Sequence, residues 1–214
     1  MRKILSYFYP ITQKIETVQN GIVEITYYNG KKMLNSAHAN YSYDSLQRIL
    51  KYGLTKVDLK QVNAILLLGL GGGSVIQTLR KDFNYTKNIT AIEIDSTIIS
   101  IAATEFQVFP SDKMEIIHAD AFQYVNSTSR KFDLIIVDLF IDDTVPDAFY
   151  SRQFWFSIVS LMNINGAFIF NAALATKVSK EFLEMLQTFS TEITISFFDN
   201  VYETNSIIVG QKRS

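Results

Sequence analysis

The stretch Ala64-Ile-Leu-Leu-Leu-Gly-Leu-Gly-Gly-Gly-Ser74 decides how the rest of the chain is interpreted. Residues 64–68 are apolar without alternation, which is typical of a parallel strand that is covered on both faces. The glycines that follow remove side chains where the chain must turn, and they leave N–H groups of the next helix open to a ligand. The run matches the G-x-G-x-x-G/A pattern at Gly69 and Gly71, with small Ser74 in the third position. It therefore predicts a site for a nucleoside-bearing cofactor.

The composition limits the classes of protein to which the chain can belong and the kinds of site it can contain. With 214 residues and 48% hydrophobic residues, it suits one α/β domain with a small appendage. A net charge of −1 gives no general case for a nucleic-acid partner. The absence of cysteine excludes disulfides and cysteine–zinc sites, and the two histidines lie far apart, so we expect no metal site. No stretch reaches the roughly 20 apolar residues of a membrane span, so we expect a cytoplasmic protein without a membrane partner.

A small β-domain is predicted over residues 1–40. Residues 15–18 and 22–28 are β-rich runs separated by Gln19-Asn20-Gly21, and Asn-Gly is the strongest short hairpin pattern. A second such pair, Asn29-Gly30, turns the chain again. These patterns predict a small antiparallel sheet ahead of the main domain.

Residues 41–214 are predicted to form a Rossmann-like α/β domain. A helix over 43–53 precedes an alternation of strands and helices, which implies right-handed crossovers and a mostly parallel sheet. The predicted strands are 64–69, 89–94, 114–118, 132–138, 165–171, 192–199 and 204–210, and the predicted helices are 74–83, 96–106, 148–162 and 177–189. Because no helix separates the last two strands, we expect a C-terminal antiparallel hairpin.

Acidic residues follow successive predicted strands. Glu93 lies 24 positions after Gly69, near the roughly 20-residue spacing at which a carboxylate binds ribose hydroxyls. Asp95 or Ser96 has an ordinary alternative role as the cap of the next helix.

Two further acids stand at the same predicted edge of the sheet. Asp120 can accept from an adenine amine or can cap a helix that begins at Ala121. Asp138 ends the fourth predicted strand. Open α/β sheets bind ligands at the carboxyl ends of their strands, so we expect these side chains to share one site.

The closing hairpin and the Asp120-Ala121 pair resemble class I methyltransferases, which bind S-adenosylmethionine (SAM). NAD-dependent dehydrogenases share the glycine turn and the acid after the second strand. Such an enzyme also carries a substrate domain, for which this chain has too few residues left. NAD-dependent redox chemistry is therefore the less favoured interpretation.

Nearly the whole chain resembles the spermidine synthase family. The resemblance rests on the hairpin preface and on segments 39–50, 71–74, 93–95, 120–121 and 136–140, in that order. It implies a methyltransferase-like fold behind a small β-domain, and transfer of a group from the sulfonium of a SAM-type nucleoside to an amine. By this match the cofactor site comprises Gly69, Gly71, Gly73, Ser74, Glu93, Asp120 and Ala121, with Glu93 on the ribose and Asp120 at the adenine.

The chain departs from the family's motifs at two positions. Ser74 stands where the family has an aspartate near the amine-bearing tail of decarboxylated SAM, so ordinary SAM becomes at least as plausible a ligand. Ile141 stands where the family's second, proton-accepting aspartate would be, and Asp142 is one residue late. By the resemblance Asp138 lies beside the transfer centre, so Asp138 and Asp142 are the catalytic candidates.

The resemblance also gives candidates for binding the acceptor. Tyr41, Tyr43 and Asp44 match the family region that lines the substrate cleft, where aromatic faces and an acid suit a polyamine. Packing of the small sheet is the alternative role of the tyrosines. Asp143 belongs to an acidic loop that favours a cationic acceptor, or else is simply solvated.

These patterns together predict a transferase that moves a methyl or aminopropyl group from SAM or decarboxylated SAM to a small cationic amine. The alternative is a nucleoside-binding protein that has lost catalysis and acts by association. Trp155 is interpreted as core packing or as a subunit contact, which leaves a homodimer open.

Overall fold

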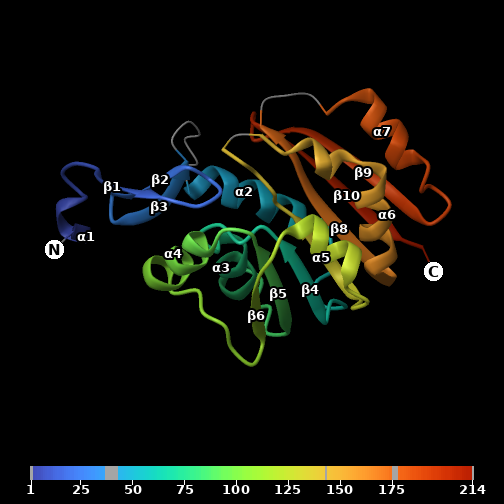
Figure 1. Cartoon of the computed structure of the whole chain (residues 1–214), viewed down its shortest axis with the longest axis horizontal. Coiled ribbons are helices and arrows are strands. Elements are labelled where there is room, and N and C mark those ends of the chain that lie inside the picture. Colours follow the sequence, from blue (N-terminus) through green and yellow to red (C-terminus); the bar gives the residue numbers. More distant parts are fainter. Residues whose placement is uncertain (1, 37–42, 143, 175–177, 214) are drawn as a thin grey trace.

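The computed structural model describes residues 2–36, 43–142, 144–174 and 178–213, and it contains two sheets (Figure 1). The smaller sheet is antiparallel and follows a short helix, α1 (Arg2–Leu5). Its strands are β1 (Ile11–Glu16), β2 (Ile22–Tyr28) and β3 (Lys31–Ser36). None of the helices in these ranges is long and apolar enough to cross a membrane.

The first hairpin of the small sheet lies where it is predicted, but its first strand begins earlier. The sequence predicts a strand over 15–18, whereas β1 ends at Glu16, which pairs with Ile22. After Glu16, the Thr17 N–H and hydroxyl both donate to the Gly21 carbonyl, and the hydroxyl accepts from the Asn20 N–H. A compact loop over residues 17–21 therefore replaces the last predicted strand residues.

The larger sheet has seven strands in the order β6-β5-β4-β7-β8-β10-β9. Its strands are β4 (Ala64–Leu68), β5 (Asn88–Glu93), β6 (Met114–His118), β7 (Phe132–Val137), β8 (Met162–Leu174), β9 (Ile193–Val201) and β10 (Asn205–Lys212). Neighbours from β6 to β8 are parallel, and β10 is antiparallel to both β8 and β9. The predicted mostly parallel sheet with a C-terminal antiparallel hairpin is confirmed.

Helices cover both faces of the large sheet. They are α2 (Tyr43–Leu54), α3 (Ser74–Lys81), α4 (Ser96–Phe106), α5 (Ala121–Ser127), α6 (Arg152–Leu161) and α7 (Lys180–Gln187). The single helix predicted over 148–162 is divided into a 3-10 turn, η1 (Asp147–Tyr150), and α6. The break comes at Ser151, whose backbone is extended (ψ 147°) and whose hydroxyl oxygen caps α6 by accepting from the Phe154 N–H.

The core has one layer on each face of the sheet. Side chains of α2 and α3 pack on one face, and those of α5, α6 and α7 pack on the other. Trp155 is fully buried against Phe168 and Phe170, with ring centroids 4.8 and 5.1 Å away. The interpretation of Trp155 as core packing is confirmed, and its alternative role as a subunit contact is wrong.

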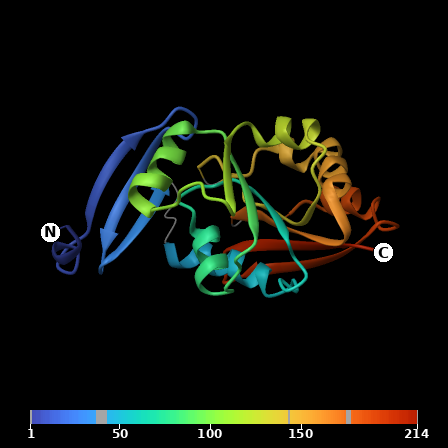
Figure 2. The same ribbon diagram turned by 90° about the horizontal axis from the view of Figure 1, so that it is seen from below.

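The small sheet packs against α4 (Figure 2). Val23 and Ile25 of β2 are buried against Ile98 and Ile101 of that helix. The domain boundary predicted at residue 40 falls outside the described residues and stays a prediction.

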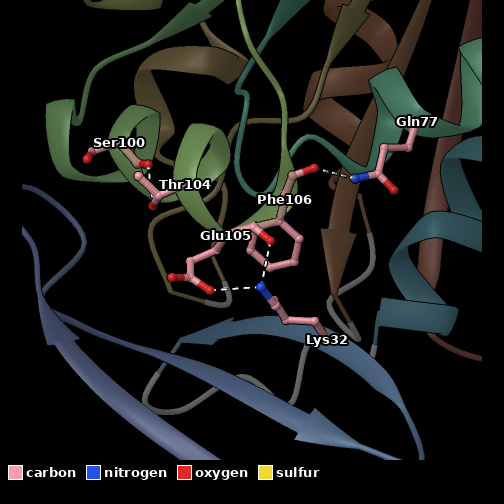
Figure 3. A network of polar contacts seen from close by, with 6 residues as sticks. All are labelled: Lys32, Gln77, Ser100, Thr104, Glu105 and Phe106. Carbon is pink, nitrogen blue, oxygen red and sulfur yellow. Dashed lines mark hydrogen bonds and ion pairs between the residues drawn. The ribbon is translucent and has the colours of Figure 1, made fainter. Parts of the chain in front are cut away.

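Lys32 of β3 fastens the small sheet to the C-terminal end of α4 (Figure 3). Its Nζ donates to the Glu105 carbonyl oxygen (2.7 Å) and to Glu105 Oε2 (2.8 Å), and a cation at this end of a helix is favoured by the helix dipole. From the other side, Gln77 of α3 donates to the Phe106 carbonyl. The end of α4 is therefore held between the small sheet and α3.

Candidate functional site

A cavity of about 390 Å³ opens at the carboxyl edge of β4, β5, β6 and β7. The glycine turn and Ser74 form one side of it, and segments after β6 and β7 form others. The small sheet contributes a further wall, which includes Gln19, Asn20, Leu34, Asn35 and Ser36. The cavity therefore lies between the N-terminal sheet and the main domain.

The glycine turn has the backbone that the sequence pattern predicts. Gly69 and Gly71 have φ of 91° and 50°, a region that favours glycine. A Cβ at Gly69 would stand 2.1 Å from the Asp138 carbonyl oxygen, whereas one at Gly71 would meet nothing within 4 Å. Close packing thus requires Gly69, while Gly71 leaves an open approach to the backbone.

Gly73 and Ser74, at the end of the turn, differ in whether they line the cavity. Ser74, the first residue of α3, lines the cavity. Gly73 packs instead against Val108, where a Cβ would stand 2.5 Å from a methyl group. Its φ of 77° shows why glycine is needed there. Gly73 therefore shapes the start of α3 rather than the cavity surface.

Glu93 lies at the end of β5, lines the cavity and is 8% exposed. Its Oε2 accepts from the N–H groups of Leu70 (3.0 Å) and Gly71 (3.3 Å), and its Oε1 accepts from the Asp95 N–H (3.0 Å). Burial raises the pKa of Glu93, and these backbone hydrogen bonds oppose the shift. Glu93 thus fixes the glycine turn, a role that its sequence position did not reveal. Its predicted contact with ribose stays a prediction.

Asp95 caps α4 and also holds the small sheet. Its Oδ1 accepts from the Thr97 and Ile98 N–H groups, which confirms the predicted cap. Its Oδ2 accepts from the backbone N–H groups of Gln19 (2.8 Å) and Asn20 (3.3 Å). Burial would raise the pKa of Asp95, but these hydrogen bonds together lower it to about 2.

Asp120 performs the ordinary role that the sequence allows it, and it still lines the cavity. Its Oδ1 accepts from the Gln123 N–H (2.8 Å) and caps α5, in which Ala121 is the first residue. Both Asp120 and Ala121 line the cavity. A contact with adenine stays a prediction.

Asp138 follows β7 at the cavity and is partly exposed to it. Its Oδ1 accepts from Nδ2 of Asn171 at 3.0 Å. Burial raises the pKa of Asp138 to about 6, and the hydrogen bond from Asn171 opposes this shift. A carboxyl group with this pKa is suited to accept a proton near neutral pH.

Asp142 also lines the cavity, on a loop closed by a bridge between Ile141 and Thr144. Its backbone has φ of 57°, and its Oδ1 accepts from the Ser36 hydroxyl at 2.5 Å. Ile141, at the position of the family's second aspartate, is 54% exposed and lines the cavity. The loop therefore brings Asp142 to the site beside β3.

The candidates for binding the acceptor are not described by the structure. Tyr41 and Asp143 lie outside the described residues. Tyr43 and Asp44 begin α2, and their side chains also lie outside the described part. All four assignments stay predictions.

The charge of the cavity is one-sided. Glu93, Asp120, Asp138 and Asp142 line it, and its described lining residues include no lysine, arginine or histidine. Such a site favours cationic ligands over anionic ones.

Sequence reasoning missed two groups of residues at the site. Asn171 and Asn205 are fully or almost fully buried behind Asp138, and a polar residue at the end of an apolar strand could have indicated them. The sequence pattern indicates only a turn at Gln19 and Asn20. Their approach to the cavity depends on the docking of one sheet against the other.

Comparison with known proteins agrees with this geometry. Residues 47–203, which make up most of the chain, match the spermine/spermidine synthase domain. The chain belongs to this family. A polyamine aminopropyltransferase of Neisseria meningitidis serogroup A is 31% identical over 123 residues, which cover 57% of this chain and 46% of that protein.

Another relative and a solved structure carry methyltransferase names. An eEF1A lysine and N-terminal methyltransferase of Xenopus laevis is 27% identical over 118 residues, which cover 50% of this chain and 17% of that protein. The crystal structure of human methyltransferase-like protein 13 in complex with SAH has a TM-score of 0.60 at 23% identity, covering 82% of this chain and 83% of that one. The last comparison supports the methyltransferase-like fold. The chain spans less than half the length of these two curated relatives.

Proposed function

We propose that the protein is a transferase that binds SAM or decarboxylated SAM in the cavity and moves a methyl or aminopropyl group to a small cationic amine. The observation that carries this proposal is the set of four carboxylates around one cavity, beside a glycine turn that is open at Gly71. Family membership supports it, because relatives are named for aminopropyl and for methyl transfer.

The residues of the cavity fit a sulfonium nucleoside. Glu93 accepts three backbone hydrogen bonds, and a carboxylate has about four acceptor positions, so one remains for a ribose hydroxyl. Asp120 is our candidate for the adenine amine, and Ser74 for the tail of the nucleoside. When bound, the nucleoside supplies an activated alkyl group.

Asp138 is our candidate proton acceptor. With a pKa of about 6 its carboxyl group is mostly ionised at neutral pH, so it can orient an ammonium acceptor and take the proton that the nitrogen loses. Asp142, held by Ser36, adds negative charge on the same side of the site. We expect activity to fall as the pH drops through about 6.

Ser74 distinguishes the two forms of the cofactor. It places no charge at the start of α3, where the family has an aspartate, so we expect SAM to bind at least as well as decarboxylated SAM. In Ser74→Asp, a carboxylate returns to the cavity, and the preference should shift by about tenfold or more toward the decarboxylated form. Ser96→Asp is the matched control, because Ser96 is likewise the first residue of a helix but does not line the cavity.

Calorimetry with SAM, decarboxylated SAM, methylthioadenosine and NAD tests the proposed ligand, and turnover of a panel of amines tests the reaction. We expect SAM-type nucleosides to bind and NAD not to bind. Binding of NAD, without binding of any of the three SAM-type nucleosides, would overturn the proposal. Nucleoside binding without turnover of any amine would favour the alternative that the protein acts by binding only.

A further inference from the structure

Three polar side chains form a row behind the cavity. Asp138 follows β7, Asn171 lies in β8 and Asn205 begins β10. Asn205 Nδ2 donates to Asn171 Oδ1 at 2.8 Å, and Asn171 Nδ2 donates to Asp138 Oδ1 at 3.0 Å. The row thus connects the inner strands of the sheet to the carboxylate at the proposed transfer centre.

The sheet register places these three side chains on one face. Val137 pairs with Phe170, so Asp138 and Asn171 are the next neighbours across the parallel pair. Asn171 pairs with Ile207, two residues beyond Asn205. Alternation along each strand therefore turns all three toward the face that α2 and α3 cover.

A local irregularity adjusts this geometry. The register of β8 against β10 shifts at Ala172, and β-bulges of this kind re-aim side chains beside active sites. The hydroxyl of Tyr150, in η1, donates to the Ala172 carbonyl. The bulge is thus contacted by η1, whose residues Ala148 and Phe149 line the cavity.

The hydrogen bonds fix which end of each asparagine side-chain amide faces Asp138. Asn171 is fully buried and Asn205 is 1% exposed, so each polar group left unpaired here costs about 1–3 kcal/mol. The Oδ1 of Asn205 is one such group, because it receives no hydrogen bond from the described residues. The side-chain NH₂ group of Asn205 donates to the side-chain oxygen of Asn171. The NH₂ group of Asn171 therefore faces Asp138. A reversed Asn171 would present its oxygen to a carboxylate.

We propose that Asn171 and Asn205 are positioning residues that hold one oxygen of Asp138 and leave its other oxygen for the acceptor. This inference rests on the proposed function, in which Asp138 accepts the proton. Asp138 receives no other hydrogen bond from the described residues, so Asn171 alone fixes its orientation there. The other charged side chains among the described residues that line the cavity are Glu93, Asp120 and Asp142. All three are acidic, so no cation in the described lining competes with Asn171 for Asp138.

A titration of the unmodified protein tests the row without any turnover. The side-chain amide signals of Asn171 and Asn205 are followed by ¹⁵N–¹H NMR from pH 4.5 to 8, with assignment through Asn171→Leu and Asn205→Leu. We expect both signals to shift with one pKa near 6, and the shift to disappear in Asp138→Asn. Amide chemical shifts that stay constant while Asp138 titrates would overturn the inference.

Kinetics of the variants give the second readout. In Asn171→Leu the ionised Asp138 loses its donor, so we expect the acid limb of the pH–rate profile to rise by about one unit. At pH 5 this costs about tenfold in kcat beyond the loss at pH 8, with KM little changed. Asn205→Leu should shift the limb in the same direction by less, while Ser206→Ala, the matched control in β10, should leave it in place.

The two proposals fail in different ways. A wild-type protein that turns over no amine contradicts the proposed reaction, while the NMR titration still tests the row. Variants that lose activity equally at every pH, or that leave the pKa of Asp138 unchanged, contradict the positioning role. Should one leucine variant fail to fold, the other variant and the wild-type titration decide.

Discussion

Replacing Asp95 is expected to loosen the small sheet and α4 together. This carboxylate is fully buried and caps α4 through Thr97 and Ile98. It also receives the N–H groups of Gln19 and Asn20 from the small sheet. Asp95→Ala therefore removes the acceptor on which two elements of the structure converge.

The pKa of Asp95 gives the size of the effect. The change from the ordinary value of 3.8 to about 2 corresponds to about 2.5 kcal/mol in favour of the ionised, folded form. Loss of a helix cap alone typically costs about 1 kcal/mol, and the same hydrogen bonds contribute to both figures. We therefore expect Asp95→Ala to lower the free energy of unfolding by about 2–3 kcal/mol, or Tm by about 4–12 °C for a chain of this size.

The sign of the pH dependence follows from the direction of the shift. A lowered pKa stabilises the fold above the unfolded value near 4, and this stability is lost as the pH falls toward 2. The measurement is urea unfolding of wild type, Asp95→Ala and Asp95→Asn between pH 3 and 7. We expect the gap between wild type and Asp95→Ala to be full at pH 6 and to narrow below pH 4, with Asp95→Asn intermediate.

Asp112→Ala is the matched control, because Asp112 is an exposed aspartate in a turn. Its effect should stay within about 0.5 kcal/mol. A loss for Asp95→Ala that equals the control, or a gap that widens on acidification, would show that Asp95 does not hold the small sheet to α4.

Four further substitutions are expected to separate packing from ligand binding. Gly69→Ala should prevent normal folding, since its Cβ would meet the Asp138 carbonyl. Gly71→Ala should lower the free energy of unfolding by only about 1 kcal/mol, and it should weaken SAM binding in calorimetry. Lys32→Met should lower the urea midpoint, with about 1 kcal/mol or more lost, because it removes a half-buried ion pair and a helix-end contact. Trp155→Ala should cost about 3–5 kcal/mol by the same assay, and a loss below 1 kcal/mol would contradict its place in the core.

Local patterns were sufficient for most of the fold. The apolar run of β4, the alternation of strands with helices, and the Asn-Gly turns predict the two sheets and the closing hairpin. The errors came where side chains compete with backbone pairing. Thr17 closes a loop that ends β1, and Ser151 caps a new helix within a predicted one. Both contacts join residues whose hydrogen-bond partners a periodicity cannot reveal.

Residue types and their spacing are enough to predict that a glycine turn and acids at strand ends meet, because parallel strands place their carboxyl ends at one edge. The use of each acid depends on the folded arrangement of the strands. Glu93 binds the turn itself, Asp95 binds the small sheet, and Asp138 depends on Asn171 from a strand that comes later in the chain. The physical reason is that hydrogen bonds and burial depend on which strands become neighbours in space. Residue type and spacing carry that information only through the completed fold.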